Sequence, residues 1–214
     1  MARAAPYHRS VASLAEIVRS RSSLSLAEVV HLQRLVATWN VLADFCFSDL
    51  LLYVPLRPEL AGMPAPLTGE VPVVPVDAPP QNSESEGDGA EFVVVGHVRP
   101  STTQTLYRTD LIGEQLDELE RPLVARAMRL GEIIEGELTV SALRERVRVL
   151  CIPVRLDGHT IAVLSRESTP SVCRSPGELE RIYVDIFNRG ARMSAAGRFP
   201  CPTDDSDAKE SPRV

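Results

Sequence analysis

The stretch that decides the fold is EFVVVGHVRPSTTQTLYRTD, residues 91–110. It begins with the strand-forming run FVVVGHV at 92–98 and changes, at Arg99-Pro100, to hydroxyl and amide side chains. A buried strand that ends in a polar loop begun by proline is a common way for a sheet to present groups to a ligand or a partner. An inner strand followed by a surface loop is the simpler interpretation. The stretch holds no catalytic constellation.

A helix and a first strand are predicted before this stretch. Residues 1–22 have a weak amphipathic pattern, which indicates a short helix or an extension outside the domain. Ser25 and Glu28 form a capping box, and apolar residues then recur at helical spacing to about Asp44. We expect Trp39 on this helix to pack in the core rather than to contact a cofactor.

A proline-rich segment separates the first two predicted strands, residues 49–54 and 92–98. Residues 55–80 hold eight of the seventeen prolines, and a run of Ser, Glu, Gly and Asp follows. This composition lacks the apolar material that would offset the entropy of ordering it. We therefore interpret residues 60–89 as a mobile insertion within a hairpin.

A β-hairpin is the clearest local prediction in the second half of the chain. Asp157-Gly158 is a strong two-residue turn signal between strands predicted at 144–154 and 159–164. A polar loop is predicted after it, at 165–175.

Two helices flank this hairpin in sequence. The first is predicted at 119–130, with Pro122 in its first turn, and an acidic break follows at 131–136. The second begins at Ser175-Pro176, where serine serves as N-cap and proline as the first helical residue.

The order of these elements predicts an α+β fold. It fits a GAF-like antiparallel sheet with its N- and C-terminal helices packed on one side. A PAS domain is the close alternative, with its short helices differently placed. We assign residues 23–197 to this domain, 1–22 to an N-terminal extension and 198–214 to a linker or tail.

Composition argues against several kinds of partner. The formal net charge of −6 and the lack of a basic stripe argue against direct contact with nucleic acid. The longest apolar run, residues 50–54, is too short to span a bilayer, and no secretory signal is recognisable, so we expect a cytoplasmic protein without membrane contact. Four cysteines are scattered without metal-ligand spacing, and we expect free thiols with the first two buried: Cys46, Cys151, Cys173 and Cys201.

Four segments resemble the N-terminal domain of actinobacterial sensor histidine kinases of the PdtaS type. They are VVHLQRLVATWNVLADFCFSDLLLYVP (29–55), VGHVRPSTTQTLYRTDLIG (95–113), IPVRLDGHTIAVLSRESTPSVCRSPGELERIYVDIF (152–187) and GRFP (197–200). The resemblance covers about 26–200, apart from the proline-rich insertion, which is longer than the family leads us to expect.

The resemblance implies a GAF-like domain followed by a linker, a PAS domain, a phosphoacceptor-histidine segment and an ATP-binding kinase module. It also implies a response regulator as partner of the full-length kinase. The chain ends at Val214 in a segment that resembles this linker, and we expect ATP to bind only in a kinase module. Because no histidine here has a phosphoacceptor motif and no phosphate loop is present, we predict no catalytic residue in these 214 residues.

Arginine and hydroxyl side chains near the predicted strand ends are the candidates for ligand binding. Together they suit a small anionic molecule such as a nucleotide. The candidates are Arg99, Thr102, Thr105, Tyr107, Arg148 and Arg166. Solvated strand-end residues would give the same pattern. We predict no cofactor and no metal, and we interpret His97 as structural rather than as a haem ligand.

The leading hypothesis is a regulatory sensor domain in which a ligand shifts the loops and thereby the terminal helices. The alternatives are a ligand-free dimerisation module and a stand-alone regulator without a kinase. For dimerisation, the apolar faces of 29–42 and 179–193 would form a homodimeric helix bundle. An enzyme would need a nucleophile–base pair, a metal set or a phosphate loop, and we find none in the sequence.

Overall fold

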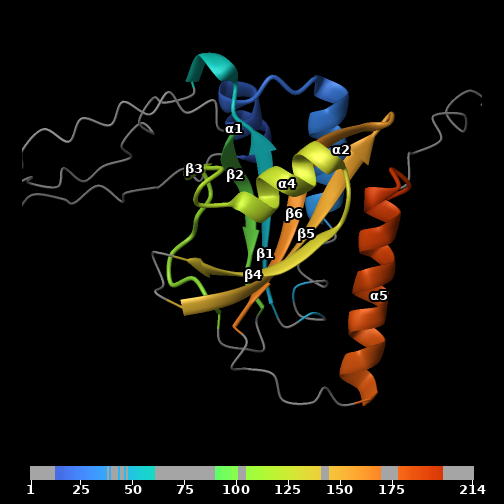
Figure 1. The fold of residues 1–214 in the computed structure, drawn as a ribbon. Coiled ribbons are helices and arrows are strands. Elements are labelled where there is room, and N and C mark those ends of the chain that lie inside the picture. Colours follow the sequence, from blue (N-terminus) through green and yellow to red (C-terminus); the bar gives the residue numbers. More distant parts are fainter. Residues whose placement is uncertain are drawn as a thin grey trace, which may run out of the picture.

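The computed structural model describes residues 13–37, 39, 43, 46, 48–60, 90–100, 105–140, 145–169 and 178–199. Within these residues, six strands form one antiparallel sheet in the order β3-β2-β1-β6-β5-β4, with helices on both of its faces (Figure 1). The predicted α+β fold is confirmed. Most of the predicted insertion at 60–89, the start of the last helix at 175–176 and most of the tail at 198–214 lie outside the described residues.

The strands agree with the predicted ones in the centre of the sheet and differ at its edges. They are β1 (Asp49–Pro55), β2 (Glu91–Val98), β3 (Gln115–Asp117), β4 (Ile134–Val140), β5 (Glu145–Leu156) and β6 (His159–Ser168). The hairpin turn between β5 and β6 is confirmed. Asp157 and Gly158 have φ angles of 49° and 84°, because a two-residue turn of this kind needs two left-handed residues.

Two boundary predictions were wrong. The acidic break predicted at 131–136 ends at Ile133, and β4 begins at Ile134. The glutamates of this region predict a loop, but Glu137 accepts a 2.7 Å hydrogen bond from Arg146 of β5, so this acidic residue pairs across two strands at the edge of the sheet. The loop predicted at 165–175 also begins later, because β6 continues to Ser168 with polar residues in its buried positions.

The helices are α1 (Leu14–Arg21), α2 (Leu26–Ala37), the short 3₁₀ helix η1 (Pro58–Leu60), α4 (Pro122–Leu130) and α5 (Glu178–Ala195). The capping box at the start of α2 is confirmed, because the backbone N–H of Ser25 donates to Glu28 over 2.6 Å and that of Glu28 donates to the Ser25 hydroxyl over 3.4 Å. In α1, Ile17 and Val18 are buried, so residues 14–21 form a helix that packs in the core.

The sheet separates two apolar cores. On one face, residues of α1, α2 and α5 share a core with alternate residues of β1, such as Leu50 and Leu52, which confirms that the terminal helices lie on one side. Trp39 is fully buried there, as predicted, and its ring lies against Gly96 of β2, where a Cβ would be 3.4 Å from it. On the other face, α4 covers the remaining positions of β1, β5 and β6 (Figure 1).

Because β1 is central and covered on both faces, its sequence is apolar at consecutive positions.

In the part of the chain that the structure describes, no helix is both long enough and apolar enough to pass through a membrane.

Candidate functional site

Five polar side chains meet in the core beneath α4, and we call them the buried polar cluster: Tyr53, Tyr107, Arg121, Ser165 and Glu167. Each of them is less than 5% exposed. Tyr53 comes from β1, Tyr107 from the segment after β2, and Arg121 directly precedes α4. Because side chains alternate along a strand, Ser165 and Glu167 of β6 both point to this face.

Glu167 is the centre of this cluster. Its carboxylate accepts hydrogen bonds from the Ser165 hydroxyl over 2.8 Å and from the Tyr53 hydroxyl over 3.2 Å. The Tyr107 hydroxyl and the Nη1 of Arg121, at 3.5 Å, donate to its second oxygen. Four donors therefore replace the water that a carboxylate loses on complete burial.

Arg121 supplies the opposite charge. Its Nη2 donates to the Tyr107 hydroxyl over 3.1 Å, and its guanidinium lies 5.9 Å from the centre of the Tyr53 ring. Burial opposes the charged form, but attraction to Glu167, together with the hydrogen bond to Tyr107, outweighs it and raises the pKa of the guanidinium. The cluster therefore contains one cation and one anion.

The neighbouring tyrosines and thiol stay protonated. Burial, followed by repulsion from Glu167, raises the pKa of Tyr53, of Tyr107 and of the Cys151 thiol above the ordinary values. The tyrosines thus act as hydrogen-bond donors, and the thiol is not an activated nucleophile. This arrangement can hold a charge pair in a fixed geometry.

A second polar group holds the segment that carries Tyr107. Asp49, the register partner of Glu167, accepts a 2.7 Å hydrogen bond from the backbone N–H of Leu106. The buried ring of His97 lies between Asp49, with Nε2 3.5 Å from its carboxylate, and the backbone N–H of Leu111, which donates to Nδ1 over 3.4 Å. Both ends of the segment are therefore tied to the sheet.

The structure describes five of the six residues that we predicted to bind a ligand, and it does not bring them all together. Tyr107 belongs to the buried polar cluster, and Thr105 donates a 2.8 Å hydrogen bond from its hydroxyl to the Tyr107 carbonyl. Arg99 lies in the two-residue segment directly after β2, and Thr102 falls outside the described residues.

The other two arginines lie elsewhere. Arg148 is exposed on β5, with its Nη2 3.5 Å from Glu137 of β4. The guanidinium of Arg166 lies over the ring of Phe187 from α5, 5.4 Å from its centre, on the face opposite to the buried polar cluster. Among the predicted residues that the structure describes, Arg148 and Arg166 therefore lie apart from Thr105 and Tyr107.

Sequence reasoning missed Tyr53, Arg121, Ser165 and Glu167. Tyr53 lies within an apolar run, and Arg121 stands at the position before a helical proline, where a short polar cap is usual. Ser165 and Glu167 continue the inward-facing positions of an apolar strand, at spacing two. That alternation was the available signal, and we interpreted it as the start of a loop.

The predictions for Cys46 and Cys151 are confirmed, because both are buried free thiols. Burial raises the pKa of Cys46 to about 11. Among the described residues, no three His, Cys, Asp or Glu side chains are grouped as a metal site would need.

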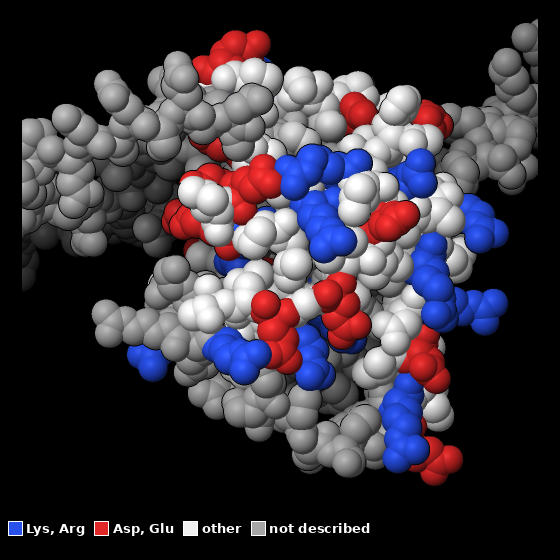
Figure 2. Space-filling view, in the orientation of Figure 1, with Lys and Arg blue, Asp and Glu red and all other residues white. Residues whose placement is uncertain are grey.

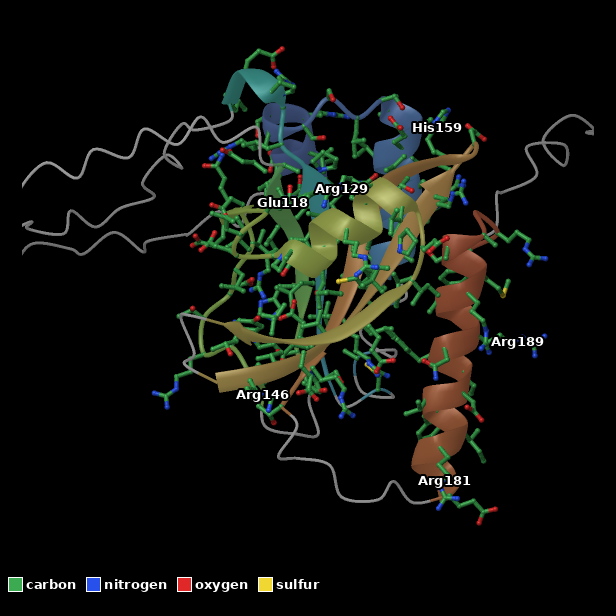
Figure 3. All side chains as sticks on the ribbon, in the orientation of Figure 1. Glu118, Arg129, Arg146, His159, Arg181 and Arg189 are labelled. Atoms are coloured by element: carbon green, nitrogen blue, oxygen red, sulfur yellow. The ribbon has the colours of Figure 1, made fainter. Side chains whose placement is uncertain are left out.

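Charged side chains also form pairs on the surface. Figure 3 shows Glu118 and Arg129 close to one another beside α4, where their atoms approach to 2.6 Å. Because Arg129 is 57% exposed in its side chain, this pair is screened by water and lies outside the candidate site.

Comparison with known proteins identifies related sequences over nearly all of this chain. A family model described as "Histidine kinase PdtaS, GAF domain" matches residues 14–186. The sensor histidine kinases PdtaS of Mycolicibacterium smegmatis and of Mycobacterium tuberculosis strain H37Rv are each 26% identical to it, over 207 and 209 residues. These matches cover 95% of this chain but only 35% of either relative.

A solved structure supports the same fold. The sensor region of a sensor histidine kinase is 25% identical, with a TM-score of 0.62 over 91% of this chain and 57% of the solved one. The GAF-like arrangement of the sheet and its terminal helices, expected from the sequence, is thereby confirmed.

Proposed function

Because this chain belongs to the family of PdtaS histidine kinase GAF domains, we propose that it is the regulatory sensor domain of a two-component sensor histidine kinase. The chain spans about a third of the length of the curated relatives that it matches. The kinase module, its ATP and the response regulator that receives the phosphoryl group are therefore parts of the proposal, as is a cytoplasmic location.

One observation carries the regulatory role. Glu167 lies in the buried polar cluster, and the next residue along β6, Arg166, contacts Phe187 of α5 on the opposite face. A change in the buried polar cluster that displaces β6 would therefore also displace Arg166 and, through its contact with Phe187, the C-terminal helix. In this proposal α5 transmits the signal towards the rest of the protein, by a small shift of a packed helix.

A small anionic or nucleotide-like molecule is the ligand class that we propose. Arg121 and the hydroxyls of Tyr53 and Tyr107 are donors that suit an anion. In this structure they donate their hydrogen bonds to the Glu167 carboxylate. A ligand that binds there must compete with this internal carboxylate. The alternative contacts are Arg99 and the Thr105 region, next to Tyr107, from the set predicted above.

The first test is the size of the native product. An antibody against this domain, used to blot the source cells, should detect a protein of at least twice this length. That product should autophosphorylate from ATP, and Glu167→Gln should change the rate, whereas Arg129→Gln, outside the candidate site, should leave it unchanged. A native product of only this length would contradict the proposal and would favour a stand-alone regulator.

A second candidate role is a ligand-free dimerisation module, and one observation favours it. Ile182 and Ile186 of α5 are 51% and 49% exposed, although α5 also packs on the sheet. We propose a homodimer through the terminal helices, compatible with either role. Sedimentation of the 214-residue chain should show weak self-association that increases with concentration, and strict monomers at high concentration would contradict it.

A further inference from the structure

The ring of His97 is a buried titratable group to which the proposed function assigns no role. Its side chain is 1% exposed, and that of Asp49 beside it is 2% exposed. His97 is the register partner of Leu51 in β1, so it points to the face of the sheet that carries the buried polar cluster. Tyr107 of that cluster lies edge-on to it, with ring centres 5.6 Å apart. A change of charge on His97 would therefore act on this cluster at close range.

The hydrogen bond from Leu111 determines where a neutral His97 carries its proton. The backbone N–H of Leu111 donates to Nδ1 over 3.4 Å, so Nδ1 presents a lone pair and the hydrogen is on Nε2. Nε2 faces the Oδ1 of Asp49 at 3.5 Å, and in the described part of the chain neither atom has another partner. The Nε2–H therefore points at a buried carboxylate oxygen that has no other donor.

A second carboxylate lies on the other side of the ring and competes with Leu111. The Oδ1 of Asp110 is 3.4 Å from Nδ1, the same distance as the Leu111 nitrogen. A lone pair on Nδ1 accepts from the Leu111 N–H and repels this oxygen, whereas a hydrogen on Nδ1 donates to Asp110 and repels the N–H. Nδ1 can satisfy only one of these two neighbours at a time, and its protonation decides which.

We propose that His97 is a switch, operated by a proton, for the segment 106–111 that carries Tyr107. In the neutral state Nδ1 accepts from the Leu111 N–H. Uptake of one proton from water at Nδ1 replaces this hydrogen bond by a charged one to Asp110. This inference goes beyond the proposed function, because it concerns the folded domain and holds with or without a kinase module.

The switch reaches the buried polar cluster through Tyr107. Protonation releases the Leu111 end of the segment, whereas Asp49 still accepts a 2.7 Å hydrogen bond from the Leu106 N–H at the other end. Tyr107 lies between these two ends, and its hydroxyl donates to Glu167. A movement of the released end therefore changes the position of a donor to the buried carboxylate.

The charged groups that face His97 leave two partners for an imidazolium. Asp49 of β1 and its register partner Glu167 of β6 are buried anions, and Asp110 of the segment after β2 is an exposed one. Arg121, directly before α4, is a buried cation whose charge is paired with Glu167. Asp49 and Asp110 thus remain to bind the charged ring from its two sides.

The outer side of the switch lies in an acidic surface. Residues 110–120 hold five acidic residues and no basic one. Figure 2 shows acidic side chains gathered beside α4, where this segment lies. Because the Asp110 side chain is 56% exposed, a proton can reach Nδ1 from water on this side, and the negative surroundings attract it.

NMR titration of the isotope-labelled 214-residue chain tests the switch. At about pH 8 the ring nitrogen shifts of His97 should show a hydrogen on Nε2 and none on Nδ1. As the pH is lowered to about 5, the signals of His97, the Leu111 amide and Tyr107 should change with one midpoint. Protection of the Leu111 amide against hydrogen exchange should fall about tenfold over the same range. The exposed His159 is the internal control, and its titration should not move the Leu111 amide.

Two variants separate the switch from a purely structural role. Asp110→Asn keeps an acceptor for the Ile112 N–H, which donates to Asp110 over 3.1 Å, but removes the charge that attracts the imidazolium. It should lower the pH of the His97 midpoint, whereas the matched control Asp185→Asn on α5 should leave this midpoint unchanged. His97→Asn offers an acceptor at the place of Nδ1 and should keep the Leu111 amide protected at every pH.

Three results would overturn the proposal. They are a hydrogen on Nδ1 at about pH 8, a ring that does not change its protonation down to about pH 5, and Leu111 and Tyr107 signals that do not follow His97. If His97→Asn does not fold, the exposed substitution Asp110→Asn still decides between the outcomes. The sensor role is decided separately, because blotting for the native product does not depend on His97.

Discussion

Glu167 and Arg121 show how much a single residue can contribute to this core. Both are almost completely buried, and each satisfies the other's charge through hydrogen bonds. We predict that Arg121→Met lowers the free energy of unfolding by about 3–5 kcal/mol, because it leaves the Glu167 carboxylate buried without its cation. Urea denaturation measures the change.

Arg148→Met is the matched control for this experiment, because its ion pair with Glu137 is exposed and screened. Its stability should stay close to that of the original chain. If Arg121→Met changed the free energy of unfolding as little as Arg148→Met, the buried polar cluster would not stabilise the structure as described.

Cys46 gives a prediction about pH at the same scale. Burial raises its pKa to about 11, above the ordinary thiol value of about 8.5–9. Below pH 8 the thiol is protonated in both the folded and the unfolded chain. The stability that comes from the raised pKa of Cys46 is therefore fully present there. As the pH rises towards 11 the unfolded chain loses this proton first, and about 2–3 kcal/mol of stability is lost. Cys46→Ala should reduce that loss, as measured by urea denaturation at pH 8 and pH 10.5.

Turns and helix starts were the elements that could be predicted from the sequence. Asp157-Gly158 and the Ser25–Glu28 box have local chemistry that permits few other structures, and both predictions hold. The edge strand β4 could not be predicted, because its glutamates are explained only by partners across the sheet. The buried polar cluster was missed for the same reason, since its members are up to 114 positions apart.

Two glycines allow a paired test at the scale of elements. Gly158 has a φ of 84° in the hairpin turn, so Gly158→Ala should destabilise the chain by about 1 kcal/mol. Gly190 lies inside α5 with open space around its Cβ position, so Gly190→Ala should stabilise it by roughly 0.5–1 kcal/mol. Thermal melting of both variants measures the two effects. A stabilising effect at Gly158 would contradict the turn geometry.

At the scale of the whole molecule, the pairing of β1 with β2 does not depend on the proline-rich segment between them. Pro55 pairs with Phe92, and the backbone N–H of Leu56 donates to the Glu91 carbonyl over 2.9 Å, so β1 and β2 are joined up to the ends of the insertion. We predict that replacing residues 61–89 by a short Gly/Ser loop leaves cooperative unfolding intact, because the entropy of closing a connection changes only slowly with its length. Loss of a single sharp melting transition would contradict this.

The alternation of β6 places a strict limit on how this chain can change in length. Glu167 and Arg166 are neighbours in sequence but contribute to opposite faces of the sheet. Deleting Ser165 would shift the two residues after it by one position along the strand, so that Glu167 would face α5 and Arg166 would face α4. This part of β6 can therefore exchange one side chain for another, but it cannot lose a residue without exchanging what it presents to the two cores.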